Sequence, residues 1–443
     1  MRRILPALLL ALGLLAGCSA PGGSSAQSAS SQPQGAQSAS SPQTGGDNVK
    51  VQTDWSVLEG DEELPPAVVN RWYDRYTDHL IPRDDYGTLL PFAGARVVLQ
   101  PLEGEIPDPD YIASSSLYGL MTQEGTVVMD PVCTAVYRVP YTSDTGESAS
   151  LPVLALEKGD GERGAPGSGS LLALAAADGS WCTDFVYWGC AASPTAILAG
   201  GETGLELLAP RTGEAVKEWS WNQLGLESGD EVPWFTGDAY STVQWTGDRF
   251  FLGCFGENGD TARFLDPMTG EVTTSSARDW YDSLDQRYQD APQTWWDAKA
   301  NGDGTYTLSM GEETHTISAP LDIGDNLPYV SGGDRVIFED GHGAFAVTDL
   351  EGTTILPRRE GTLTVLQNDW EGGRAWLAVR LEGEELWLLY NWDGTLASSV
   401  PGAPDSWCST SGPLVEVRAD ATAAYYRPED GRCVLRVYFG LDG

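Results

Sequence analysis

Eight short polar corners, each containing a glycine between two apolar runs, restrict the fold of this chain more than any other feature. The corner glycines are Gly125, Gly179, Gly213, Gly270, Gly311, Gly352, Gly394 and Gly431. Two strand-length apolar runs joined by such a corner predict a β-hairpin. Glycine is favoured there because a tight hairpin usually holds one residue at positive φ, where other residues are strained. Each corner therefore predicts one hairpin with a glycine at positive φ.

The spacing of the corners predicts the architecture. Successive corner glycines lie 54, 34, 57, 41, 41, 42 and 37 residues apart. A repeat of about 40 residues with several short strands is typical of a β-propeller blade, and insertions in surface loops account for the longer gaps. We therefore predict an all-β fold, a β-propeller of seven or eight blades with eight preferred, over residues 86–443. The 16 Trp and 17 Tyr residues suit packing of one blade on the next.

Two segments have a helical pattern. In residues 64–80 an apolar residue recurs every fourth position, which places one apolar stripe on a helix. We expect this helix, within an N-terminal helical segment 51–85, to pack on the propeller. The second segment, residues 277–300, lies inside a repeat and is expected to cap one face, with an interruption at Pro292.

The N-terminus has the pattern of a secretory signal. Arg2 and Arg3 precede the apolar run ILPALLLALGLL, which is too short for a relaxed transmembrane helix. The next residues, Leu15-Ala16-Gly17-Cys18, resemble the lipobox of bacterial lipoproteins. That resemblance implies cleavage after a signal peptide 1–17 and a diacylglyceryl group on the sulfur of Cys18. The protein would then be anchored by lipid, without spanning, on the extracytoplasmic face of a cell membrane. The alternative is an ordinary secreted protein with a chance cysteine.

Residues 19–50 are almost wholly Ser, Gln, Ala, Gly and Pro, so this stretch has too few apolar residues to form a core. Together with the lipidated cysteine, residues 18–50 are expected to form a disordered linker. A flexible chain of 32 residues has a mean reach of roughly 30 Å. The folded part would stay near the membrane and reorient freely.

The formal net charge of −38 bears on the partners. A surface so acidic repels nucleic acid and anionic lipid headgroups, so we expect no nucleic-acid partner. A solvated acidic surface without a specific charged partner accounts for the same composition.

Besides Cys18 the chain has six cysteines: Cys133, Cys182, Cys190, Cys254, Cys408 and Cys433. An even number in an exported protein permits disulfides, and Cys182 and Cys190 are close enough in sequence to bridge adjacent strands. Buried free thiols are the alternative. No C-x-x-C pair and no Cys/His pair with zinc-finger spacing occurs, so no metal site is predicted.

Motifs for catalysis are missing from the sequence. There is no G-x-S-x-G, no G-x-G-x-x-G after a strand and no G-x-x-x-x-G-K-[ST], so we predict no catalytic residue and no cofactor. The three histidines are His79, His315 and His342. Acidic pairs such as Glu384-Glu385 are numerous, but glycoside hydrolysis needs two carboxyls at a set separation across a cleft. Asn301-Gly302-Asp303-Gly304 is expected to form a turn, since it does not follow a calcium-binding loop.

Trp234, Trp295 and Trp296 lie in the two longest insertions and are the candidate ligand-binding residues. Flat indole rings beside carboxylates suit stacking on sugars. The alternative is that they fold under the loops as small hydrophobic clusters.

Two families resemble parts of the repeat region. Tyr118-Gly119, Glu124-Gly125 and Asp130-Pro131, followed by Tyr137, look like a WG repeat, and 343–357 is a weaker copy. The lead-in DYGTLLPFAG (85–94) resembles that of some bacterial lipoproteins with such repeats. The stretches 171–181, 205–219 and 263–272 resemble blades of quinoprotein-like propellers, a class that includes envelope-assembly lipoproteins and quinone-dependent dehydrogenases. The chain has no vicinal cysteine pair, and only the first two copies end in Trp. The resemblance therefore supports the fold and not the cofactor.

Three functions fit these features. The first is a non-catalytic, surface-anchored propeller that binds an envelope protein or a glycan. The second is an extracytoplasmic propeller enzyme, a glycoside hydrolase or lyase that uses Asp and Glu. The third is an assembly scaffold. A deep axial pocket with two close carboxylates beside an aromatic residue would favour the enzyme, and a flat, apolar-rimmed face would favour partner binding.

Overall fold

The chain divides into two compact units, Met1–Gln43 and Thr44–Gly443. The computed structural model describes only residues of the second unit. They are 50–52, 56–57, 79–100, 115–142, 148–158, 171–226, 233–235, 242–256, 259–290, 293–367, 376–419 and 422–438. The predicted signal peptide, Cys18, nearly all of the linker and the predicted helix up to residue 78 lie outside the described residues.

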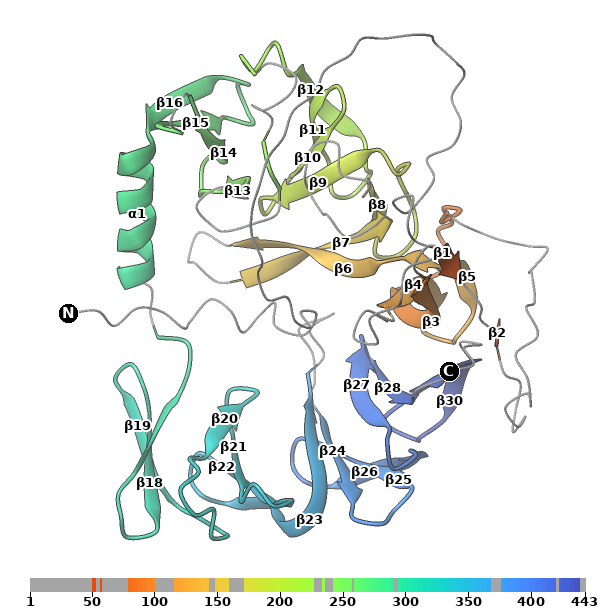
Figure 1. The fold of residues 1–443 in the computed structure, drawn as a ribbon, viewed down its shortest axis with the longest axis vertical. Coiled ribbons are helices and arrows are strands. Elements are labelled where there is room, and N and C mark those ends of the chain that lie inside the picture. Colours follow the sequence, from red (N-terminus) through yellow and green to blue (C-terminus); the bar gives the residue numbers. More distant parts are fainter. Residues whose placement is uncertain are drawn as a thin grey trace. The chain divides into compact units, whose positions relative to one another are not determined.

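Apart from one helix, the helices and strands of the described chain are all antiparallel strands (Figure 1). The first sheet has the order β1-β3-β4-β5, with β1 Lys50–Gln52, β3 Leu89–Gln100, β4 Ser115–Thr122 and β5 Val127–Cys133. The second runs from β6 to β12: β6 Ala135–Thr142, β7 Ser148–Lys158, β8 Leu171–Ala176, β9 Tyr187–Ala192, β10 Ile197–Gly201, β11 Gly204–Leu208 and β12 Ala215–Ser220. The third contains β13 Gln244–Trp245, β14 Phe250–Phe255, β15 Thr261–Leu265 and β16 Val272–Ser276.

The remaining sheets repeat the pattern. The fourth has three strands, β17 Asp297–Ala300, β18 Thr305–Met310 and β19 Glu313–Ser318. The fifth runs from β20 to β26: β20 Tyr329–Ser331, β21 Arg335–Glu339, β22 Ala344–Asp349, β23 Thr354–Leu366, β24 Trp376–Leu381, β25 Leu386–Tyr390 and β26 Leu396–Pro401. The last has the order β2-β30-β29-β28-β27, with β2 Ser56–Val57, β27 Trp407–Ser411, β28 Leu414–Ala419, β29 Thr422–Tyr426 and β30 Cys433–Tyr438. The short strands β1 and β2 were not predicted from the sequence.

Each seven-stranded sheet consists of two successive up-and-down units. The second sheet is continuous at β8–β9 through a single pair, Leu172 with Tyr187. In the fifth sheet β23 serves both units, because it pairs with β22 up to Glu360 and with β24 from Gly361 onwards. From β3 onward, sheet neighbours are consecutive in sequence throughout.

All eight corner glycines have positive φ, between 61° and 83°. Seven join two named strands that pair with each other, and Gly179 leads from β8 to the isolated bridge between Ala175 and Cys182. The prediction of eight hairpin corners with glycine in the left-handed region is therefore confirmed.

Several corners are covered by residues near the end of the preceding unit, which gives a second reason for glycine. Trp181 lies over Gly213 and Trp219 lies over Gly270, so that a Cβ on either glycine would overlap the indole. A Cβ on Gly394 would likewise overlap the carbonyl oxygen of Ile355. These corners thus pack one up-and-down unit onto the next.

The last sheet has the same relation to the first. A Cβ on Gly125, in the first sheet, would overlap the carbonyl oxygen of Val434 in β30. One hydrophobic cluster contains Leu90, Phe92 and Met121 from the first sheet and Tyr425 and Leu435 from the last.

Polar contacts cross the same boundary between the first and last sheets. The backbone N–H of Ala93 donates to the hydroxyl of Tyr425 at 2.7 Å. The Ser411 hydroxyl donates to the carbonyl oxygen of Pro91, and Arg427 pairs with Glu124. The beginning and the end of the described β-region are therefore in direct contact.

The helix α1, Ala277–Asp290, lies between β16 and β17 (Figure 1). The Ser276 hydroxyl accepts the backbone N–H of Arg278 at 3.2 Å, as an N-cap residue does. Trp280 packs on Phe251 and Phe264 of the third sheet, with ring centroids 4.5 Å and 5.3 Å apart. The prediction of a helix that covers one face and ends before Pro292 is confirmed for 277–290.

The same prediction is wrong for residues 297–300, which form strand β17. Pairing with β18, in which Asp297 lies opposite Ser309, overrides the helical pattern of the sequence. Within the ranges that the structure describes, no helix is both long and apolar enough to cross a bilayer.

Candidate functional site

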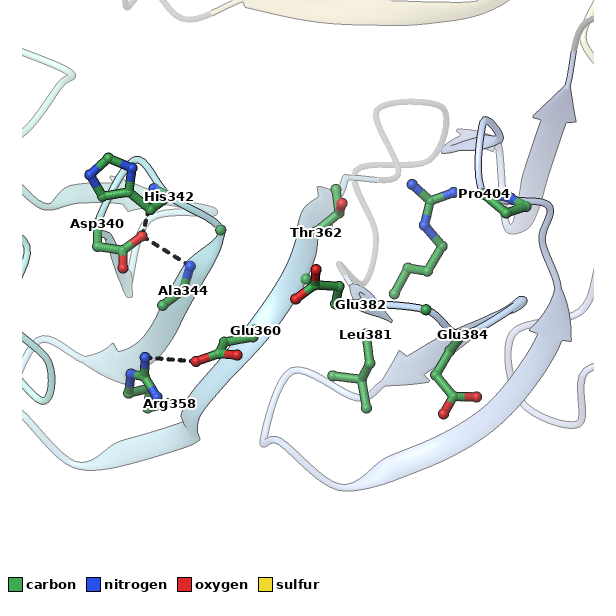
Figure 2. A pocket seen from close by; sticks show the side chains of 14 residues that line it. Asp340, His342, Ala344, Arg358, Glu360, Thr362, Leu381, Glu382, Glu384 and Pro404 are labelled. Atoms are coloured by element: carbon green, nitrogen blue, oxygen red, sulfur yellow. Dashed lines mark hydrogen bonds and ion pairs between the residues drawn. The ribbon is translucent and has the colours of Figure 1, made fainter.

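The candidate site is a hollow of about 570 Å³ where the two units of the fifth sheet diverge from their shared strand β23. Its lining comes from the β21–β22 loop, from β23, from the end of β24 with the following loop, and from Pro404 (Figure 2). Gly361, at the bend of β23, has φ 146° and accommodates the carbonyl oxygen of Arg380 where a Cβ would overlap it. The hollow thus follows from one strand that belongs to both units of the fifth sheet.

Asp340 is held in the β21–β22 loop by the backbone. Its Oδ1 accepts the N–H of His342 at 2.7 Å and that of Ala344 at 3.0 Å (Figure 2). These two hydrogen bonds, His342 first, lower the pKa of the Asp340 carboxyl, because they stabilise its charged form. Asp340 therefore stays ionised near neutral pH and is unsuited to the role of general acid.

The arginines around the hollow already have partners. Arg358 pairs with Glu360 at 2.9 Å, and both side chains are more than half exposed, so the pair contributes little to stability. Arg380 donates to the carbonyl oxygens of Ala403 at 2.6 Å and of Ser406 at 3.0 Å. Its guanidinium also lies 5.0 Å from the ring centroid of Trp387. Arg380 therefore fixes the connection between β26 and β27.

Glu382 and Glu384 supply the remaining carboxylates of the hollow, and both side chains are exposed (Figure 2). Among the described residues, no Phe, Tyr or Trp side chain lines the hollow. The arrangement offers charged groups and backbone for binding, but it lacks the carboxylate pair beside an aromatic ring that would favour a glycoside hydrolase. Among the described residues, no group of three or more His, Cys, Asp or Glu side chains is arranged to hold a metal ion.

The three predicted ligand-binding tryptophans lie outside this hollow. Trp234 is 52% exposed, and its carbonyl oxygen accepts the backbone N–H of Val243 at 2.7 Å. Trp295 is 51% exposed. Trp296 instead packs against the core of the fourth and fifth sheets, with its ring 5.5 Å from that of His315. The structure thus leaves two of the three indoles exposed for a ligand.

Cys182 and Cys190 are not bridged, so the disulfide prediction is wrong for this structure. All six described cysteines are free thiols. The physical reason is that the two side chains pack on different clusters: Cys182 lies against the core between the first and second sheets, and Cys190 lies against the interior of the second sheet. Burial raises the pKa of both thiols to about 12, which keeps them protonated and unreactive. Cys18 lies outside the described residues.

Sequence reasoning noticed two parts of the hollow but did not bring them together. His342 was noted as one of three histidines, and Glu384 as one of many acidic residues. No sequence signal predicted that β23 would pair with both units of the fifth sheet. This shared strand places the β21–β22 loop and the loop after β24 around one hollow.

The sequence matches no protein-family model and no curated protein. Solved structures with a similar fold include BamB from Moraxella catarrhalis, at 11% identity and TM-score 0.24, covering 89% of this chain and 99% of that one. AztD from Citrobacter koseri is similar at 10% identity and TM-score 0.27, covering 80% and 95%. A eukaryotic initiation factor is similar at 10% identity and TM-score 0.30, covering 73% and 93%. Likenesses at these TM-scores carry no argument about the function of this chain.

Proposed function

We propose that the protein is a lipid-anchored, non-catalytic β-propeller that binds a protein partner at the extracytoplasmic face of a cell membrane. The observation that carries the proposal is the order of features at the N-terminus. A basic start, an apolar run and Leu15-Ala16-Gly17-Cys18 precede a linker of 32 residues and then a repeat domain. A lipid on Cys18 would hold that domain near the membrane while the linker lets it reorient.

The propeller has eight blades in this proposal. Support comes from the eight corner glycines at positive φ, one in each up-and-down unit. Further support comes from Gly125, which is covered by Val434 of the last sheet. In the same way Gly394 is covered by Ile355, which belongs to the unit before that of Gly394. In a closed ring of blades, the last unit lies next to the first, in the position that a preceding unit has elsewhere.

Binding is favoured over catalysis by the chemistry of the hollow. Asp340 is bound by backbone N–H groups, Arg380 fixes a neighbouring connection, and no described Phe, Tyr or Trp side chain lines the hollow. Propellers present ligand sites on loops that a rigid scaffold positions. A glycan partner would use exposed Trp234 or Trp295, and a pure assembly scaffold would use the same surfaces without a small ligand.

Replacement of Cys18 by Ala tests the anchor. The unchanged chain should fractionate with membranes and incorporate a labelled fatty acid, whereas Cys18→Ala should do neither and should appear in the soluble exported fraction. Crosslinking of the anchored full chain on intact cells then tests partner binding. A Cys18→Ala protein that still fractionates with membranes would contradict the anchor, and a chain that crosslinks to no protein would contradict partner binding.

A further inference from the structure

Among the described residues, the fourth sheet has three strands, one fewer than the third sheet. Gly311 joins its last two strands, β18 and β19, just as Gly270 joins the last two of the four strands in the third sheet. The position beside β17, where the other units have their first strand, is therefore the one that no described strand fills. No described residue pairs with that edge of β17.

The hydrogen-bond pattern shows which backbone groups face this position. The two-residue turn after Met310 makes Met310 and Glu313 a hydrogen-bonded pair. Every second residue of β18 therefore points its backbone N–H and C=O groups toward β17 and not toward β19. The N–H of Asn301 donates to the carbonyl oxygen of Thr305 at 3.0 Å, which agrees with that alternation. Thr305, Thr307 and Ser309 thus face β17.

It follows that β17 presents every second residue to the open edge. Asp297 and Lys299, opposite Ser309 and Thr307, are bonded to β18. Ala298 and Ala300 therefore turn their N–H and C=O groups away from the sheet. An unpaired row of backbone donors and acceptors is a template for another strand.

Two further observations concern the fourth sheet: its corner glycine and the residue just before β17. Gly311 has no atom within 4 Å of where its Cβ would be, whereas Gly213, Gly270 and Gly394 are covered by the preceding unit. Trp295, just before β17, is exposed, while its neighbour Trp296 packs inward. An exposed indole beside an open strand edge offers apolar area to whatever pairs there.

Charge indicates the chemistry of the occupant. Residues 293–318, which contain the fourth sheet, have a net charge of −3 within a chain of −38. Such a surrounding attracts a basic segment and disfavours a second copy of this acidic chain.

We propose that the open edge of β17 binds an extended, Lys- or Arg-rich segment of a partner protein, which adds to the fourth sheet as a further strand. Recognition would combine backbone hydrogen bonds to Ala298 and Ala300 with contact on Trp295, the mode known as β-strand addition. This inference rests on the proposed partner-binding function and gives it a location.

The test uses the full chain and a fluorescein-labelled peptide amide, Lys-Val-Lys-Val-Lys-Val, measured by fluorescence anisotropy. Ala300→Pro removes one outward N–H, leaves the β17–β18 ladder intact and alters an exposed side chain. Ala300→Ser is the matched control, since it retains the N–H. We expect at least fivefold weaker binding to Ala300→Pro and unchanged binding to Ala300→Ser.

A second probe separates strand addition from simple charge attraction. The same peptide with N-methylated valines keeps its charge and side chains but loses backbone donors, so we expect it not to bind measurably. Equal binding of both peptides, or equal binding to Ala300→Pro and Ala300→Ser, would overturn the proposal. A dimer of the chain that Ala300→Pro dissociates would also overturn it, because a second copy would then occupy the edge. Because Cys18→Ala leaves the edge intact, loss of anchoring and loss of peptide binding are separate results.

Discussion

Removal of one hydroxyl group, in Tyr425→Phe, should weaken the contact between the first and last sheets. The Tyr425 side chain is fully buried, and its hydroxyl accepts the N–H of Ala93 at 2.7 Å and donates to Glu416 Oε1 at 3.1 Å. Ala93 is also buried, at a register shift of the β3–β4 ladder, so no ladder partner replaces the lost acceptor. The phenyl ring keeps the packing, which isolates the hydrogen bonds.

The expected loss follows from two contributions. A buried N–H left without an acceptor costs about 1–3 kcal/mol, and a hydrogen bond to a carboxylate is worth about 1.5–3 kcal/mol. Glu416 is half-buried and also accepts the Ser409 hydroxyl at 3.0 Å, so water replaces part of the second contribution. We therefore expect the free energy of unfolding to fall by about 2–4 kcal/mol.

Urea unfolding followed by tryptophan fluorescence measures this loss, with Tyr426→Phe as the matched control. Tyr426 is the next residue and is also buried, but its hydroxyl has no hydrogen-bond partner among the described residues. The control should change the free energy of unfolding by less than about 0.5 kcal/mol. Equal effects of the two substitutions would refute the hydrogen-bonded contact between the first and last sheets.

Three further predictions test other parts of the account. Gly270→Ala should lower the free energy of unfolding by about 2–4 kcal/mol, because the new Cβ overlaps Trp219 and a residue other than glycine is strained at positive φ. Gly311→Ala, which adds only the strain of positive φ, should lower it by about 1 kcal/mol. Urea unfolding midpoints of the two variants measure the difference. Burial raises the pKa of the Cys133 and Cys190 thiols to about 12. Their contribution to the free energy of unfolding is therefore complete below the unfolded thiol pKa of about 8.5 and is lost as the pH rises toward 12. The urea midpoint should fall steadily between about pH 8 and pH 11. Alkylation under denaturing conditions, followed by intact mass measurement, should label both Cys182 and Cys190 without prior reduction. A protein whose mass is two hydrogens lower, and in which these cysteines are labelled only after reduction, would contradict the free thiols.

The sequence predicted the corners well because their cause is local. Positive φ in a tight hairpin favours glycine, and the pattern of two apolar runs around it is visible in a few residues, as at Gly352 and Gly394. Helix α1 was predicted for a similar reason, since the pattern from Ala277 to Asp290 needs little help from distant residues.

What the sequence did not predict depends on distant contacts. Residues 297–300 follow a helical pattern but pair with β18. The sharing of β23 by the two units of the fifth sheet places Asp340 and Glu382 around one hollow. The proximity of Cys182 and Cys190 in sequence suggested a bridge, yet the two faces on which they pack are set by the sheet as a whole.

The central claim is a ring of eight blades whose last unit packs on the first. A crystal structure of the mature chain tests it most directly. We expect eight successive antiparallel units around one axis, with the Tyr425 hydroxyl within hydrogen-bond distance of the Ala93 N–H. Fewer than six units around an axis, or a first and a last sheet that do not touch, would contradict the account.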